Sequence, residues 1–129
     1  MRTSRSEERG SAVVEFALVL PLLLFLTLAL VQVGLLMRDQ LLVVQASRAA
    51  AREAALDADD ERVRAAAERA APGLEPEALD VSIARNGGRG DPVTASVSYS
   101  AAPGVPFVGE LFPDSVSLNS VSTARQEFT

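Results

Sequence analysis

The sequence predicts an α+β fold: a long N-terminal transmembrane helix that extends outside the membrane, a second short helix, and a small antiparallel three-stranded sheet. Three features predict it. Residues 16–37 carry no charge, residues 35–71 contain neither Gly nor Pro, and later segments alternate apolar with polar residues. Six of the seven Pro and six of the eight Gly lie beyond Ala71. The expected divisions are a basic leader (1–10), a transmembrane helix (11–37), an extracytoplasmic helical segment (38–72) and an antiparallel β domain (73–129).

The composition excludes much chemistry. The 129 residues include no His and no Cys, so no Ser-His-Asp or Cys-His site, no thiolate or imidazole zinc site and no disulfide can form. The 12 cationic side chains are all Arg and are interleaved with 17 acidic ones, giving a net charge of −5, which argues against a nucleic-acid partner. We expect no enzyme activity, no catalytic residue, no cofactor and no metal site.

The uncharged segment between Glu15 and Arg38 has the length of a membrane span. Its 22 residues are apolar except for Pro21, Thr27, Gln32 and Gly34. As a helix they extend about 33 Å, which matches a hydrocarbon core of about 30 Å. A secretory signal peptide is the alternative, but its apolar region is shorter and ends in small residues, whereas this segment runs into Arg38.

The orientation of the span follows from its flanks. Arg2, Arg5 and Arg9 precede it, and the positive-inside rule keeps that end in the cytoplasm. Residues 39–129 then lie outside, in the bacterial case beyond the cytoplasmic membrane. They carry 8 Arg against 14 acids, which agrees with export.

The helix is expected to continue beyond the span, from about Ser11 to Leu56, because good helix formers follow Arg38 without interruption. At 1.5 Å per residue its length is about 70 Å. Small residues on the outer part allow either the close approach of another helix outside the membrane or an Ala-rich helix exposed to water: Ala46, Ala49, Ala50, Ala54 and Ala55.

A second helix is expected after the acidic cluster Asp57-Ala58-Asp59-Asp60, since Asp caps free N–H groups at a helix start. The cluster lacks the Gly and terminal Glu of an EF-hand loop, so a helix start explains it better than a cation site. One weakly apolar face is formed by Val63, Ala66, Ala67, Ala70 and Leu74. Pro72-Gly73 supplies the stop.

The remaining segments predict three antiparallel strands. Residues 79–84 and 93–99 alternate with a period of two around the turn Asn86-Gly87-Gly88, and a third strand is expected over 116–124 after a Pro- and Gly-rich loop from Ala101 to Pro113. Arg89-Gly90-Asp91 spells an adhesion-receptor tripeptide, but a Gly turn between two charges also arises freely from composition.

Glu15 is the most informative residue, because a carboxylate at the edge of an uncharged helix is costly in lipid and usually has a partner. The alternative is that it marks the water interface. Pro21 removes one helix hydrogen bond and predicts a kink. Thr27 and Gln32, five residues apart, do not share a face, and no special role is expected for them.

Residues 9–21 read RGSAVVEFALVLP, a short basic leader followed by Gly and by Glu five residues later. This resembles a class III, prepilin-type signal sequence. Residues 10–24 are similar to the TadE-like family of pseudopilins of tight-adherence (Tad or Flp) pili. The resemblance covers residues 9–50, and the exported αβ tail with its ending STARQE over residues 122–127 is also similar.

The resemblance implies cleavage between Gly10 and Ser11 by a prepilin-type peptidase. The new α-amino group would pair with Glu15 of a neighbouring subunit, with Glu15, Phe16 and Pro21 as the assembly and register residues. It also implies a membrane-embedded, pilus-assembling protein in homo- or hetero-oligomers, whose partners are membrane lipid, other pilin-like subunits and the Tad assembly platform. The alternatives are an uncleaved single-pass anchor that scaffolds another envelope complex and, less favoured by the lack of His and Cys, a tethered exported hydrolase.

Overall fold

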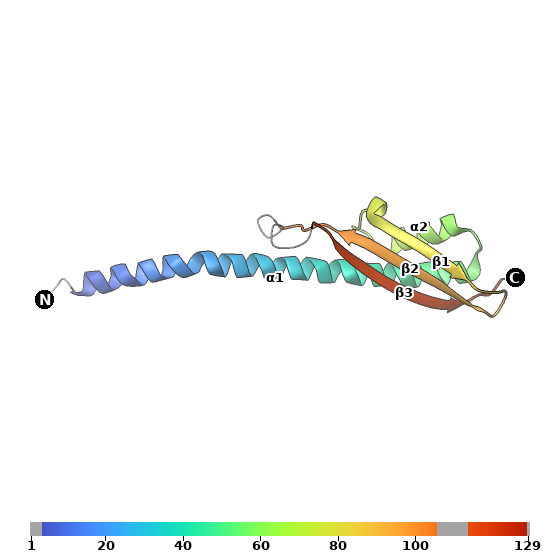
Figure 1. The fold of residues 1–129 in the computed structure, drawn as a ribbon, viewed down its shortest axis with the longest axis horizontal. Coiled ribbons are helices and arrows are strands. Elements are labelled where there is room, and N and C mark those ends of the chain that lie inside the picture. Colours follow the sequence, from blue (N-terminus) through green and yellow to red (C-terminus); the bar gives the residue numbers. More distant parts are fainter. Residues whose placement is uncertain (1–3, 106–113, 129) are drawn as a thin grey trace.

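The computed structural model describes residues 4–105 and 114–128 and confirms the α+β class (Figure 1). Arg2 of the leader and residues 106–113 of the expected loop lie outside the described residues. The elements in chain order are α1 (Ser4–Leu56), α2 (Asp60–Ala70), the short 3-10 helix η1 (Pro76–Ala78), β1 (Leu79–Arg85), β2 (Pro92–Ala101) and β3 (Val116–Arg125). Figure 1 shows the sheet and α2 gathered around the C-terminal half of α1, while the N-terminal half projects alone.

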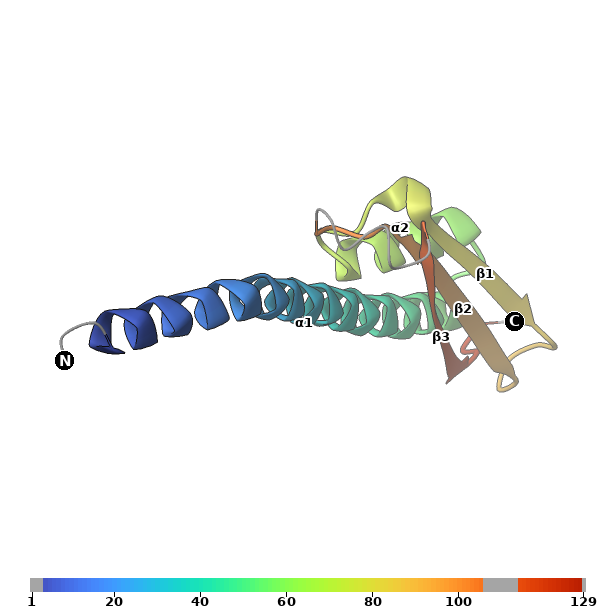
Figure 2. The same ribbon diagram turned by 60° about the vertical axis from the view of Figure 1, so that its left-hand side comes forward.

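Helix α1 is longer than expected, with 53 residues or about 80 Å. It begins at Ser4, inside the expected leader, rather than at Ser11. Glu7 in its first turn interacts favourably with the helix dipole, and the single Gly10 costs about 1 kcal/mol, too little to end a helix. Pro21 lies inside α1 without interrupting it, and Figure 2 shows one continuous, gently curved helix.

The N-terminal half of α1 is apolar and bare. Most of its large side chains from Val13 to Val31 are exposed. A core helix would be buried inside the protein, but the apolar part of α1 is not. The helix is long and apolar enough to cross a membrane. One such helix near the N-terminus fits a single-pass membrane protein.

The C-terminal half of α1 packs against the sheet and α2 through its small residues. Ala46, Ala50 and Ala54 are completely buried, in contact with a core that includes Val93 and Val97 of β2. Alanine brings no side chain beyond Cβ, so the helix backbone can lie close to the strands. Of the two expectations for this Ala-rich segment, the close approach of another helix is confirmed by α2, and the water-exposed helix is wrong. The packing of the sheet on the same segment was not expected.

Helix α2 forms as the sequence predicts. Asp59 is its N-cap, and its carboxylate accepts a hydrogen bond from the Glu61 N–H at 3.0 Å. Val63 and Ala67 are its buried residues, and α2 lies beside α1. After Ala70 the chain turns at Gly73, whose φ of 91° is favourable for Gly only.

The three strands form one antiparallel sheet in the order β1-β2-β3. Val97 in the central strand lies opposite Val81 of β1 and Ser120 of β3. Alternate residues of β2 point toward α1 and are buried, and the intervening ones carry the polar outer face. The apolar side of the sheet is thus covered, and the side rich in Ser and Thr faces outward.

The turn between β1 and β2 is held by its own polar groups and by the C-terminal segment. The Asp91 carboxylate accepts from the Gly88 N–H at 2.9 Å, while the Gly90 N–H donates to the Gln126 carbonyl at 2.7 Å. The Gln126 N–H in turn donates to the Asp91 carbonyl at 2.8 Å. The acidic residue of Arg89-Gly90-Asp91 therefore serves its own turn, which supports the compositional explanation of this tripeptide.

Asp57 lies between α1 and α2, and its lowered pKa predicts that the stability of the fold depends on pH. One carboxylate oxygen accepts from the Asp59 N–H at 2.9 Å and the other from Arg62 at 2.7 Å. The backbone hydrogen bond first, and then Arg62, lower the pKa of Asp57 below its ordinary value of 3.8. Because the folded-state pKa is the lower one, this stabilisation is present above pH 3.8 and is lost as the pH falls through the lowered pKa.

We expect Asp57→Asn to lower the thermal stability at pH 7 and to reduce the loss of stability between pH 7 and pH 3. The chain has one Tyr and no Trp, so fluorescence of the buried Tyr99 reports unfolding of the sheet. Asp80→Asn, the same change at an exposed position of β1, is the control. Equal acid sensitivity of the Asp57 variant and the unmodified chain would contradict the role of Asp57.

Candidate functional site

The five residues expected to guide processing and assembly lie near the free end of α1. All five are exposed, far along the helix from the sheet (Figure 1): Gly10, Ser11, Glu15, Phe16 and Pro21. A Cβ added at Gly10 would meet no atom within 4 Å. The site is thus a bare stretch of helix that another molecule can reach from any side.

The helical geometry brings some of these residues together and separates others. Ser11 and Glu15 are four residues apart, so they lie on one face on successive turns. Phe16 and Pro21 point in other directions, since each residue turns the helix by about 100°. The structure therefore places Ser11 and Glu15 on the same face of α1, and it does not bring Glu15, Phe16 and Pro21 into one patch.

Cleavage after Gly10 would change the surroundings of Glu15. The helix would then begin at Ser11, with its α-amino group one turn from the Glu15 carboxylate. A carboxylate near a helix N-terminus is stabilised by the dipole and by a cationic amine. In the uncleaved chain, the Gly10–Ser11 peptide bond lies inside α1, so a protease that binds extended substrate must first open this turn.

Glu15 has no partner within the part of the chain that the structure describes. No hydrogen bond and no ion pair joins it to residues 4–105 or 114–128, and its neighbours toward the C-terminus are apolar. A carboxylate in such a position requires water, a lipid headgroup or a cation from a second molecule. The exposed apolar side chains on the same half of α1 likewise require lipid or other helices.

Gln32 is a residue that the sequence analysis missed. It is 2% exposed, and its side-chain oxygen accepts hydrogen bonds from the Gly104 and Val105 N–H groups, both at 3.1 Å. The expectation of no special role is therefore wrong for Gln32. The Thr27 hydroxyl donates to the Leu23 carbonyl of its own helix at 2.8 Å. The available signal was a lone amide in an otherwise apolar span.

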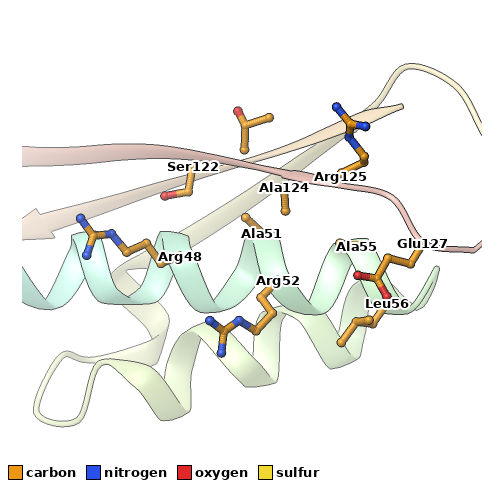
Figure 3. Close-up of a pocket in the computed structure, with 10 residues that line it drawn as sticks. Arg48, Ala51, Arg52, Ala55, Leu56, Ser122, Ala124, Arg125 and Glu127 are labelled. Carbon is orange, nitrogen blue, oxygen red and sulfur yellow. The ribbon is translucent and has the colours of Figure 1, made fainter. Parts of the chain in front are cut away.

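A groove of about 670 Å³ lies between α1 and β3, at the opposite end of the molecule from the free helix (Figure 3). Arg48 and Arg52 line it from α1, Arg125 lines it from the end of β3, and Glu127 lines it from the segment that follows. Figure 3 shows the side chains of Arg48 and Arg52 extending to the same side and that of Arg125 extending away from both, so the three guanidinium groups do not converge on one ligand. The groove lacks the geometry of an anion site.

Comparison with known proteins bears on the N-terminal third of the chain. Residues 10–52 match the family model described as TadE-like protein, which confirms the resemblance predicted for residues 9–50. The match runs along α1 from Gly10 to Arg52 and so includes most of its bare half and all but the last four residues of its packed half. No curated protein and no solved structure matches the chain.

Proposed function

Because residues 10–52 are TadE-like, we propose that this chain is a pseudopilin-like structural subunit of a Tad/Flp-type pilus or secretion apparatus. It does no catalysis. Helix α1 anchors it in the bacterial cytoplasmic membrane with its N-terminal end inside, and the αβ domain lies outside. Its partners are membrane lipid, a prepilin-type peptidase, other pilin-like subunits and the Tad assembly platform.

The observation that carries this proposal is the solitary Glu15 on the bare half of α1. An apolar helix that packs on nothing in its own chain suits two environments in succession, first lipid and then a bundle of equivalent helices. In either environment an uncompensated carboxylate is costly, by several kcal/mol in a low-dielectric setting. The chain's own amine, one turn away, lowers part of that cost, and a cationic amine from a neighbouring subunit lowers it further only when the helices are in the right register.

Processing supplies this amine. The new α-amino group of Ser11 would have an ordinary pKa of about 7.7–8.0 and so be largely protonated at neutral pH. Ser11 and Glu15 lie on one face of α1, so the amine of one subunit and the carboxylate of the next can meet when parallel helices are offset along their axes. Gly10 favours the preceding cleavage, since Gly in a helix lowers the free-energy cost of opening that helix for the peptidase by about 1 kcal/mol relative to Ala.

The proposal predicts that Gly10→Ala blocks processing without disturbing the fold. An added Cβ at residue 10 meets nothing within 4 Å, and Ala favours the helix, so the fold is unchanged. Loss of cleavage would then show that the peptidase recognises Gly10 or needs it to open the helix at this peptide bond. Gly34→Ala is the matched control, because Gly34 lies in the same helix and its Cβ would also meet nothing. The measurement is intact mass and N-terminal residue after expression with a matching prepilin peptidase.

The unmodified chain and Gly34→Ala are expected to begin at Ser11 and to remain in the membrane fraction. Gly10→Ala is expected to begin at Met1. If the unmodified chain also begins at Met1, while a known substrate is cut in the same cells, the chain is instead an uncleaved single-pass anchor. The continuity of α1 across Gly10 and Ser11 is the observation that favours this second function.

A further inference from the structure

The segment that follows β2 docks on α1 inside the expected membrane span. Gly104 and Val105 donate their N–H groups to Gln32, and a Cβ at Gly104 would lie 3.5 Å from Leu35 Cδ1. Gln32 lies six residues before Arg38, which together with Asp39 forms the first pair of charged residues on the outer side. This places the contact about 9 Å deeper than the charged pair along the helix axis. Figure 1 shows the chain leaving β2 toward the N-terminal end of α1.

The hydrogen bonds at Gln32 satisfy polar groups that lipid tails could not satisfy. Irregular backbone at membrane depth must satisfy its N–H groups within the protein, because lipid tails offer no acceptor. The Gln32 amide in turn is costly among apolar side chains unless it is bonded. Here one side-chain oxygen accepts from two successive backbone N–H groups, and Gln32 and Val105 are 2% and 7% exposed. Both polar partners are thereby removed from contact with lipid.

We propose that residues 102–105 form a second membrane contact, in which the exported domain rests on the outer leaflet and is held there by Gln32. A depth of about 9 Å below the charged pair agrees with the depth of about 5–10 Å at which interfacial segments bury their apolar side. Ala102 is exposed and carries no charge. The partner is the acyl and headgroup boundary of the bilayer. The inference rests on the proposed membrane span of α1.

The absence of Cys allows a direct test with single labelled cysteines. The full chain carrying Ala102→Cys is labelled with an environment-sensitive fluorophore and reconstituted into phosphatidylcholine and phosphatidylglycerol vesicles that contain lipids with a quencher on the acyl chain. Leu26→Cys, near the middle of the span and exposed, is the positive control. Asn86→Cys, exposed in the turn at the far end of the sheet, is the negative control.

We expect loss of fluorescence at positions 26 and 102 and none at position 86. No loss at position 102, with loss at position 26, would overturn the second contact while leaving the membrane span intact. No loss at position 26 would overturn the span itself, and with it the inference. Added to the Ala102→Cys chain, Gln32→Leu keeps the span apolar but removes the acceptor. It is expected to reduce the quenching at position 102, and unchanged quenching would contradict the role of Gln32.

Discussion

A chain carrying Glu15→Val is expected to insert into the membrane normally and to fail to assemble into pili when it is the only copy. Insertion is preserved because the substitution lengthens an already apolar segment. Assembly fails because the α-amino group of each mature subunit loses the carboxylate that selects the register of its neighbour. In a low-dielectric helix bundle an unpaired charge costs several kcal/mol, enough to reduce assembly by orders of magnitude. The measurements are membrane fractionation, N-terminal sequencing and the amount of surface pili.

Glu7→Val is the matched control for this prediction. It makes the same chemical change in the same helix, but on the leader, which processing would remove from the mature subunit. It is expected to leave the pili unchanged once the leader has been cut. Normal pili from the Glu15→Val chain would exclude Glu15 as a register residue. Accumulation of uncut Glu15→Val chain would instead assign Glu15 to recognition by the peptidase.

Ala50→Leu is expected to destabilise the exported domain by about 1–3 kcal/mol, because it adds three carbon atoms to a filled interface. Ala50 is completely buried in the core that α1 forms with α2 and the sheet. For a domain of this size each kcal/mol lowers the Tm by about 4–8 °C. The change can be followed through Tyr99 fluorescence on heating the full chain in detergent.

Ala65→Leu provides the comparison for this interface. Ala65 lies in α2 but is exposed, and Leu is nearly as good a helix former as Ala, so the Tm should change little. A Tm for Ala50→Leu as high as that for Ala65→Leu would show that the helix and sheet separate easily. Such a result would contradict the close packing on which the position of the domain depends.

Local patterns in the sequence predicted most of the fold. The long helix follows from an uncharged span over residues 16–37 and from the absence of Gly and Pro over residues 35–71, and the N-cap of α2 follows from its Asp cluster. The three strands follow from alternation and turn residues. These features depend on neighbours in the chain, which is why sequence reasoning reaches them. The start of α1 at Ser4 was missed because a basic leader with one Gly has no strong helix or coil preference.

The sequence by itself determined the fold class, the TadE-like character of residues 10–52 and the positions of Gly10, Ser11 and Glu15 at the N-terminal side of a long apolar helix. The tertiary structure alone decided which way the Ala-rich segment faces and what Gln32 does. Ala46, Ala50 and Ala54 could equally line a water-exposed helix, and only the approach of the sheet makes their size matter. Gln32 accepts hydrogen bonds from the backbone of Gly104 and Val105, which lie 72 and 73 positions later in the chain. No local sequence pattern encodes such a distant partner.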